Sequence, residues 1–213
     1  MRSILTPVNI KFLLNGLGLT LYIAVITIVL SLALGVVLAV MRNSSIKVLN
    51  KISVIYIELF RNTPLLLWIL AMRFLVRIGA VNSGILALTL FTASIIAEIV
   101  RGGLNSIKVG QYEAAYSQGF SEVQVLAHII LPQAIRNMMP SLLSQFVTVI
   151  KDTSFLWATG IEELTGRGMI LMGSFVTSDQ VFMLFIILSL TYFVINFILS
   201  SIIRSQQFKF ATS

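Results

Sequence analysis

Long apolar runs alternate with short polar segments along most of this sequence. Four of the runs contain no charged residue: residues 12–41, 78–97, 137–150 and 180–203. A fifth apolar stretch, residues 52–72, is interrupted by Glu58 and Arg61. A helix rises about 1.5 Å per residue, so roughly 20 apolar residues cross the hydrocarbon core of a membrane. Three of the uncharged runs reach this length unaided, and the pattern predicts an all-α, polytopic membrane protein.

The uncharged run 137–150 is too short to cross a membrane by itself. It must tilt, extend past Pro140 toward the preceding polar segment, or continue across Lys151 and Asp152. With any of these solutions the chain has about five transmembrane helices. No stretch between the runs suggests a separate soluble domain, so we expect residues 1–213 to form a single transmembrane domain.

The mostly polar segment between the third and fourth spans, about residues 102–136, contains signals for helix ends and a turn. Gly119 stands where a helix can reverse, and Pro132 stands where a helix would stop. Ser121 and Gln124 have the spacing of a capping box that opens a second helix. Four apolar residues are then expected on one face of that helix: Val123, Leu126, Ala127 and Ile130. The segment therefore predicts two short helices with a tight bend between them, which is the form of a docking element.

Seven residues of this segment resemble the EAA loop of ABC importer permeases. The family pattern is E-A-A, three residues, G, nine residues, I, one residue, L and P. Every position is matched here, by Glu113, Ala114, Ala115, Gly119, Ile129, Leu131 and Pro132. The resemblance implies a type I ABC importer permease whose cytoplasmic coupling helices insert into a cleft of a separate ATPase. The alternative is an amphipathic helix pair at the membrane interface that has no protein partner.

Composition agrees with a membrane protein and excludes some sites. Hydrophobic residues make up 57% of the chain and charged residues 11%, whereas a soluble domain carries about 25% charged residues. There are no cysteines, so disulfides and cysteine-ligated metals are excluded. The net charge of +7 comes from basic residues beside the apolar runs. Basic residues in these positions orient the spans in the membrane and contact lipid headgroups, so nucleic-acid binding is not indicated.

The basic residues also predict an orientation. If the segment 102–136 is cytoplasmic, the lysines and arginines on that side are Arg42, Lys47, Lys51, Arg101, Lys108, Arg136, Arg204 and Lys209. Those on the other side are Arg2, Lys11, Arg73, Arg77 and Arg167, and Arg61 and Lys151 remain within the membrane. The excess inside predicts a multi-pass protein of the plasma or inner membrane with its N-terminus outside and its C-terminus in the cytoplasm.

Glu58 and Arg61 are charged residues within an apolar stretch. They lie three apart, so on a helix they share a face and are expected to pair. Pro64 should break the helix there, with the side chains of Asn62 and Thr63 meeting the freed carbonyls. Arg61 to Leu66 also resemble the R-N/G-T-P-L-L signature of polar amino acid permeases. Glu58 and Pro64 are structural or gate candidates, and Arg61 and Thr63 are substrate-pathway candidates. The alternative is that Glu58 and Arg61 form a structural ion pair that locks two helices together.

A second polar interruption, Lys151, Asp152, Thr153 and Ser154, follows the fourth run. Adjacent residues point in different directions on a helix, so a helix that ends or unwinds here is expected. Free backbone groups at such a break are a common site for a small charged ligand. The segment resembles the family stretch K-D/N-T/S-S-L/A, with Phe155 in place of the usual small or aliphatic residue. These residues are substrate-pathway candidates, and the alternative is a snorkelling Lys151 with a capping Asp152.

Two further segments extend the resemblance to essentially the whole chain. Ala97 to Gly103 match the family pattern A-E-I-x-R-G-G, and Gly110 and Gln111 precede the EAA tripeptide as in the family. Within the first of these, Glu98 and Arg101 are candidates for a structural or gating role. In the loop 152–179, residues 161–164 suggest a short amphipathic helix that ends near Gly166 and Gly168.

Motifs for catalysis are missing from the sequence. There is no phosphate-binding G-x-x-x-x-G-K-[S/T] loop, no H-E-x-x-H metal motif, and a single histidine, His128. We therefore expect that this chain is not an enzyme and holds no metal or cofactor. ATP and Mg²⁺ are expected on a partner ATPase.

The resemblance implies the membrane subunit of an ABC importer that moves a polar amino acid into the cytoplasm. Its expected partners are a second permease of the same or a related chain, two ABC ATPases, an extracytoplasmic binding protein, the amino acid and the lipid bilayer, with no nucleic acid. The alternative is an ion-coupled secondary carrier or a channel, for which the sequence offers no repeat.

Overall fold

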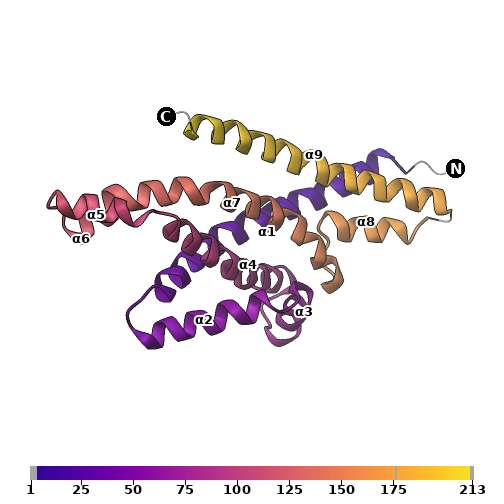
Figure 1. The fold of residues 1–213 in the computed structure, drawn as a ribbon. Coiled ribbons are helices and arrows are strands. Elements are labelled where there is room, and N and C mark those ends of the chain that lie inside the picture. The colour runs from indigo at the N-terminus through magenta and orange to yellow at the C-terminus, as the bar shows by residue number, and fades with distance from the viewer. Residues whose placement is uncertain (1–3, 176, 212–213) are drawn as a thin grey trace.

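The computed structural model describes residues 4–175 and 177–211, with side chains up to Ile202, and this part of the chain contains helices and no strands (Figure 1). In chain order the helices are α1 (Pro7–Arg42), α2 (Lys47–Arg61), α3 (Leu65–Leu75), α4 (Ala80–Asn105), α5 (Val109–Ser117), α6 (Glu122–Gln124), the π-helix η1 (Val125–Ile130), α7 (Leu131–Asp152), the 3₁₀-helix η2 (Thr153–Thr159), α8 (Leu164–Met172) and α9 (Ser178–Ala211).

Helices α1 and α4 form the central pair and run in the same direction. Ile23 shares a buried cluster with Leu88, whereas Leu38 and Ala39, further along α1, share one with Ala97 further along α4. A Cβ atom on Gly35 would lie only 2.6 Å from Ile96 Cγ2, so the absence of a side chain lets the two backbones approach. Gly35 therefore serves the close packing of α1 against α4.

Helices α2 and α3 are separated by a sharp break at Pro64, as the sequence predicts. Their axes are bent by 105°. The side-chain amide of Asn62 donates to the Glu58 carbonyl oxygen at 2.9 Å, and the Thr63 hydroxyl donates to the Leu59 carbonyl oxygen at 2.7 Å. Polar side chains thus satisfy carbonyl groups that the missing next turn leaves open.

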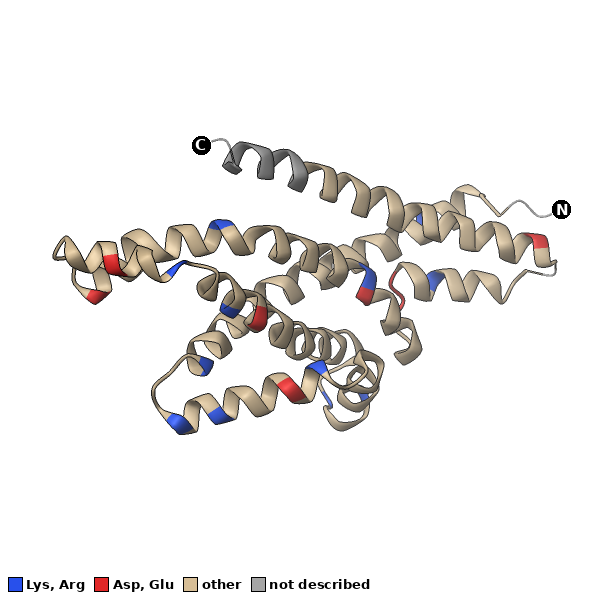
Figure 2. Ribbon diagram, viewed as in Figure 1, with Lys and Arg blue, Asp and Glu red and all other residues tan. Residues whose placement is uncertain are grey.

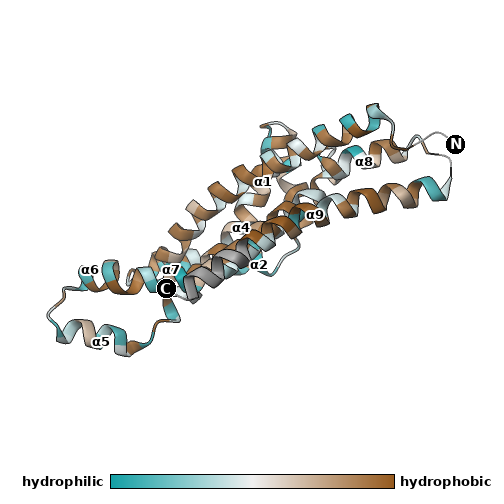
Figure 3. Cartoon of the chain, turned by 90° about the horizontal axis from the view of Figure 1, so that it is seen from above, coloured by the Kyte–Doolittle hydropathy of each residue, from teal (hydrophilic) through white to brown (hydrophobic). Residues whose placement is uncertain are grey.

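Three described helices are long and apolar enough to cross a membrane: α1, α4 and the part of α9 up to Ile202. The bent pair α2 and α3 counts as a fourth span if it crosses as one unit. The remaining expected span is α7, whose 22 residues extend the short uncharged run 137–150 backward to Leu131 and forward to Asp152, with Pro140 inside the helix. Helix α7 is long enough, but Gln133, Arg136 and Asn137 make its first turns polar. Figure 3 shows the contrast between the largely hydrophobic α1 and α9 and the mixed α5 and α6.

Helices α5, α6 and η1 form a projection at one end of the molecule, which we call the arm (residues 109–130) (Figures 1 and 3). The N-terminus lies at the opposite end, and α9 runs back toward the end that carries the arm. Two hydrogen-bonded side chains fix the base of the arm, because Asn137 Nδ2 of α7 lies 2.8 Å from the Ser106 hydroxyl just after α4. These two residues set a common level from which depth along α4 and α7 can be counted.

The expected helix over residues 161–164 is wrong. Helix α8 begins at Leu164, and Gly166 and Gly168 lie inside it. A Cβ atom on Gly168 would lie 2.5 Å from Leu188 Cδ1 of α9, so this glycine permits a helix–helix contact and does not end the helix.

Candidate functional site: the arm, an arginine cluster and a broken helix

The bend of the arm has the local structure that its sequence predicts. Gly119 has φ +82°, in the left-handed region that glycine adopts without steric cost. Ser121 caps the next helix: its hydroxyl accepts from the Gln124 N–H at 3.5 Å, and the Gln124 side chain accepts from the Ser121 N–H at 2.9 Å. The tight turn and the capping box are both confirmed.

The predicted end of the helix at Pro132 is wrong. Pro132 lies in the first turn of α7, directly after the π-helix η1, and the chain stays helical from Glu122 to Asp152. Proline has no N–H to donate to the preceding turn, so this continuous helix lacks one backbone hydrogen bond at Pro132. The wider turns of η1 also change the hydrogen-bond register just before the proline.

The predicted apolar face of this helix is largely wrong as well. Ile130 is buried, but Val123, Leu126 and Ala127 are exposed, and Val125 takes the inner position. The π-turns rotate the following residues relative to an α-helix, so an α-helical period assigns the wrong side.

Five of the seven motif residues lie in the arm, and the other two, Leu131 and Pro132, begin α7. Ala115 is buried against the core that includes Val125 and Ile130, and Ile129 is partly buried. Glu113, Ala114, Leu131 and Pro132 are exposed. The exposed surface of the arm also carries large apolar side chains, namely Val109, Tyr116, Phe120, Val123 and Leu126. An exposed apolar surface on a projecting element is typical of a protein-binding site.

Glu98 of α4 is the centre of an ion-pair group that we call the arginine cluster. Arg42 Nη1 lies 2.7 Å from Glu98 Oε1, Arg101 Nη2 lies 2.9 Å from Glu98 Oε2, and Arg61 Nη1 lies 3.5 Å from Glu98 Oε2. The cluster joins the ends of α1 and α2 to α4. The structural candidates Glu98 and Arg101 therefore meet Arg61, which the sequence placed in a different group.

The expected pair of Glu58 and Arg61 is wrong. The Glu58 carboxylate accepts from Asn62 Nδ2 at 2.8 Å, and Arg61 extends to Glu98. The helix break explains the change, because Asn62 turns back onto the last turn of α2. The other candidates at the break have structural positions: Pro64 directly precedes α3, and the Thr63 hydroxyl accepts from Trp68 Nε1 at 2.7 Å.

Lys151 and Asp152 end α7, and Thr153 and Ser154 start η2. The predicted helix end is therefore confirmed. Lys151 is exposed and Asp152 is partly buried, while the Thr153 hydroxyl is buried and donates to the Ile150 carbonyl oxygen at 2.7 Å. Within the described part of the chain, Lys151 has no ion pair at 4 Å or less.

Glu98, at the centre of the arginine cluster, and Lys151, at the end of α7, lie at different depths along their helices. Counted from the level of Ser106 and Asn137, Glu98 lies about 12 Å along α4, and Lys151 lies about 21 Å along α7. Figure 2 shows the charged pair at the end of α7 apart from the charges nearer the arm. The guanidinium group of Arg61 contacts Glu98, as that of Arg42 does, so the arginine cluster and Lys151 are separate groups of charges.

A buried carboxylate, Glu163, was missed by the sequence reasoning. It is fully buried and caps α8, with Gly166 N–H at 2.8 Å and Thr165 N–H at 3.0 Å. The hydroxyls of Thr20 on α1 and Tyr192 on α9 also donate to it, at 3.2 and 2.9 Å. We call these groups the Glu163 junction. The signal in the sequence was weak, since an acidic residue before Leu164 and Thr165 is ordinary for a helix start.

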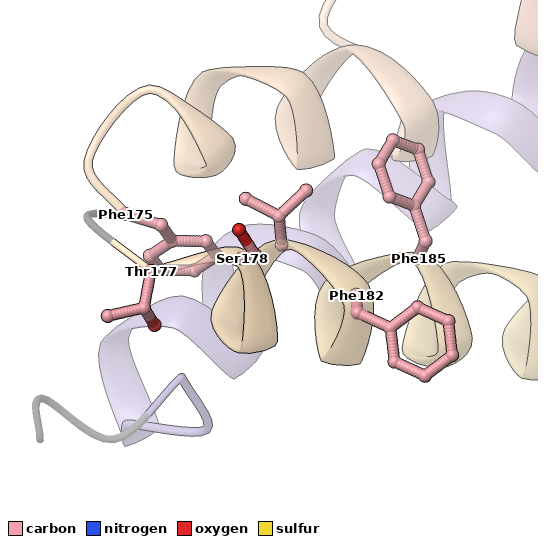
Figure 4. Close-up of a pocket in the computed structure, with 6 residues that line it drawn as sticks. Phe175, Thr177, Ser178, Phe182 and Phe185 are labelled. Carbon is pink, nitrogen blue, oxygen red and sulfur yellow. The ribbon is translucent and has the colours of Figure 1, made fainter.

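Several cavities lie among the described residues at the end away from the arm. One of about 510 Å³ opens at the turn into α9 and is lined by phenylalanines with Thr177 and Ser178. Figure 4 shows Phe182 and Phe185 projecting from different sides of α9. Its described lining residues carry no charge, which suits a lipid-facing groove better than a zwitterion site. A smaller cavity of about 250 Å³ borders the end of η2 and has Trp157 and Glu162 in its wall.

Comparisons with known proteins agree with the sequence resemblance. A family model described as "Binding-protein-dependent transport system inner membrane component" matches residues 31–211. The probable glutamine ABC transporter permease protein GlnP of Bacillus subtilis (strain 168) is 36% identical over 197 residues, covering 90% of each chain. The glutamate transport system permease protein GluD of Corynebacterium glutamicum is 35% identical over 199 residues, covering 90% of this chain and 72% of that protein.

A solved structure has the same fold. It is described as the crystal structure of an amino acid ABC transporter with histidines. The two chains superpose with a TM-score of 0.88 at 29% sequence identity, and the match covers 98% of this chain and 99% of the other.

Proposed function

Because the chain belongs to the family of binding-protein-dependent transport system inner membrane components, we propose that it carries a polar amino acid into the cytoplasm as one permease subunit of an ATP-driven importer. Like the other members of its family, the chain is a multi-pass membrane permease and not an enzyme. The amino acid substrate is supported by the relatives named for glutamine and glutamate and by the amino acid transporter of the same fold. An ion-coupled carrier would leave the family match unexplained.

The observation that carries the coupling proposal is the arm. Its motif residues lie on a projection whose bend is fixed by Gly119 and Ser121 and whose outer surface is apolar. A separate ATPase that binds ATP and Mg²⁺ would hold this surface in a cleft. Movement of the ATPase would then pull on α7, because the arm continues into α7 without a break in the helix.

The fold also supports the expected orientation. The arm and the end of α9 lie toward one end of the molecule, and the N-terminus lies toward the other (Figure 1). If the arm is cytoplasmic, Arg42, Lys47 and Arg101 lie on the cytoplasmic side, which agrees with the positive-inside rule. The N-terminus is then outside, where the binding protein delivers the amino acid.

The translocation route is proposed to include the end of α7. An amino acid carries a carboxylate and an ammonium group, and each needs a partner once water is removed. Lys151 offers a cation to the carboxylate, while Asp152, Thr153 and Ser154 offer oxygens to the ammonium group. The expected assembly contains a second permease, which is either the same chain or a related one. A second permease is needed because about five spans are too few to enclose a pathway.

Co-expression and reconstitution test the proposal. The permease is purified from its host with its ATPase and binding protein, placed in proteoliposomes, and assayed for ATP hydrolysis and uptake with a panel of L-amino acids. We expect one or a few polar amino acids to stimulate hydrolysis, and the permease alone to hydrolyse none. Robust hydrolysis by the purified permease, or a complex that responds to no amino acid, would contradict the proposal.

A further inference from the structure

Helix α2 presents three different faces. Ser53, Ile57 and Phe60 are buried against the bundle. A second face is apolar but exposed, and consists of Val48, Ile52, Ile55 and Leu59. The third face is exposed and charged: Lys47, Lys51, Glu58 and Arg61, at spacings of one or two helical turns. In a membrane the apolar face suits lipid or a partner chain, whereas the charged face requires water, as in a transport pathway.

The charged face of α2 ends at the arginine cluster, which has an excess of positive charge. Three guanidinium groups share the single carboxylate of Glu98, so two positive charges have no acidic partner within the cluster. Glu58 does not supply it, since its carboxylate accepts from Asn62. Uncompensated charges are costly near a membrane interior, so the cluster favours an additional anion.

Arg61 is the member of the cluster that is most able to change partner. Arg42 is the least exposed of the three, with 19% of its side chain accessible, and it makes the shortest contact. Arg101 binds both carboxylate oxygens of Glu98 through Nε, each at 3.2 Å, in addition to its 2.9 Å contact. Among the described residues, Arg61 has only the polar contact of 3.5 Å with Glu98, and its side chain is 43% exposed. Glu98 thus keeps its ion pairs with Arg42 and Arg101 if Arg61 leaves.

We propose that the arginine cluster is an anion site that receives the α-carboxylate of the transported amino acid on the arm side of the membrane. This site rests on the proposed function and adds a second station to it, nearer the arm than Lys151. Arg61 exchanges Glu98 for the substrate carboxylate, which it binds with two parallel N–H donors. When the amino acid leaves toward the cytoplasm, Arg61 returns to Glu98. Glu98 therefore acts as a built-in competitor that keeps the affinity of the site low enough for release.

Binding to the complete transporter in nanodiscs tests this site. Permease and ATPase are assembled without nucleotide or binding protein, and the Kd of radiolabelled L-glutamine, L-glutamate, L-arginine and L-histidine is measured. For the amino acid that binds, Arg61→Gln should raise Kd about tenfold or more, and Arg61→Lys should raise it less because the charge remains. Glu98→Gln or Glu98→Asp should lower Kd, because the competing carboxylate is removed or shortened. The matched control is Arg73→Gln, an exposed arginine in the last turn of α3, which should leave Kd unchanged.

Two additional measurements distinguish the substrate carboxylate from a lipid phosphate as the bound anion. The carboxamide of the same amino acid, which lacks the carboxylate, should bind weakly and equally to wild type and Arg61→Gln. The measurement is repeated in phosphatidylcholine alone and with phosphatidylglycerol. If the difference between the variants appears only with the anionic lipid, a lipid phosphate fills the cluster and the proposal is wrong. Equal Kd values for wild type and Arg61→Gln overturn the site but leave the proposed function intact. A wild-type complex that binds no amino acid overturns both.

Discussion

The arm and the Glu163 junction each turn the chain from one helix toward the next, and they place their polar groups in opposite surroundings. In the arm the capping Ser121 and Gln124 are exposed, and their bonds join residues three apart. In the junction the capping Glu163 is fully buried, and two of its donors come from α1 and α9, far away in the sequence. A local, exposed cap leaves an element free to bind a partner, whereas a buried cap ties three helices together. We expect mutations in the first to affect coupling and mutations in the second to affect folding.

The largest effect is expected for Glu163→Ala. It leaves two backbone N–H groups and two hydroxyls without their acceptor in a buried site, which should cost about 3–5 kcal/mol of stability. The yield of folded permease and its melting temperature in detergent measure the loss. The control is Glu162→Ala, one residue earlier and exposed, which should change stability by less than about 0.5 kcal/mol. If both variants lose the same amount of stability, the hydrogen bonds of the Glu163 junction do not stabilise the packing of α1, α8 and α9.

The next effect concerns coupling and is expected for Gly119→Val. A β-branched residue at φ +82° is strained, so the second helix of the arm would be misplaced. Uptake in proteoliposomes should be abolished, while the permease still inserts and reaches normal yield. Gly110→Val is the matched control, since Gly110 lies in α5 with no atom near its missing Cβ, and most of its uptake should remain. Normal uptake by Gly119→Val with the ATPase still bound would remove the docking role of the arm.

A third prediction tests a position outside both regions. Lys151→Met removes an exposed cation at the end of α7 without emptying the core. If Lys151 binds the substrate carboxylate, uptake should fall about tenfold or more, while the yield of complex with the ATPase stays near that of wild type. Arg61→Met should behave in the same way. Lys11→Met, an exposed lysine near the start of α1, is the control. Parallel loss of uptake and complex would mean that Lys151 is structural.

The smallest effect is expected for Ser121→Ala. Loss of the capping box should destabilise the short helix of the arm by about 1 kcal/mol, because one N–H loses its acceptor and remains hydrated. Hydrogen exchange of residues 122–125 should accelerate about fivefold, with global melting unchanged. Ser117→Ala, whose hydroxyl bonds only to the Glu113 carbonyl of its own helix, should change exchange less. A large drop in melting temperature would mean that the arm is part of the folded core.

The sequence by itself determined the features that depend on neighbouring residues. The apolar runs fixed the helical membrane architecture, because burial of about 20 consecutive apolar residues is decided by the bilayer and not by the rest of the chain. Pro64, the capping box and Gly119 act within a few residues, so the helix break and the bend of the arm were predictable. The end of α7 at Asp152 was predictable for the same reason.

Only the tertiary structure decided which distant polar groups meet. Arg61 has an acid one turn away, yet it lies against Glu98 because the break at Pro64 and the close contact at Gly35 bring α1, α2 and α4 together. Glu163 gains its donors only when α1 and α9 pack beside α8. The π-turns of η1 likewise reversed the expected faces of the arm, since helical period is set by packing around Val125 and Ile130 as well as by local sequence. Long-range pairing depends on helix geometry that no short window of sequence contains.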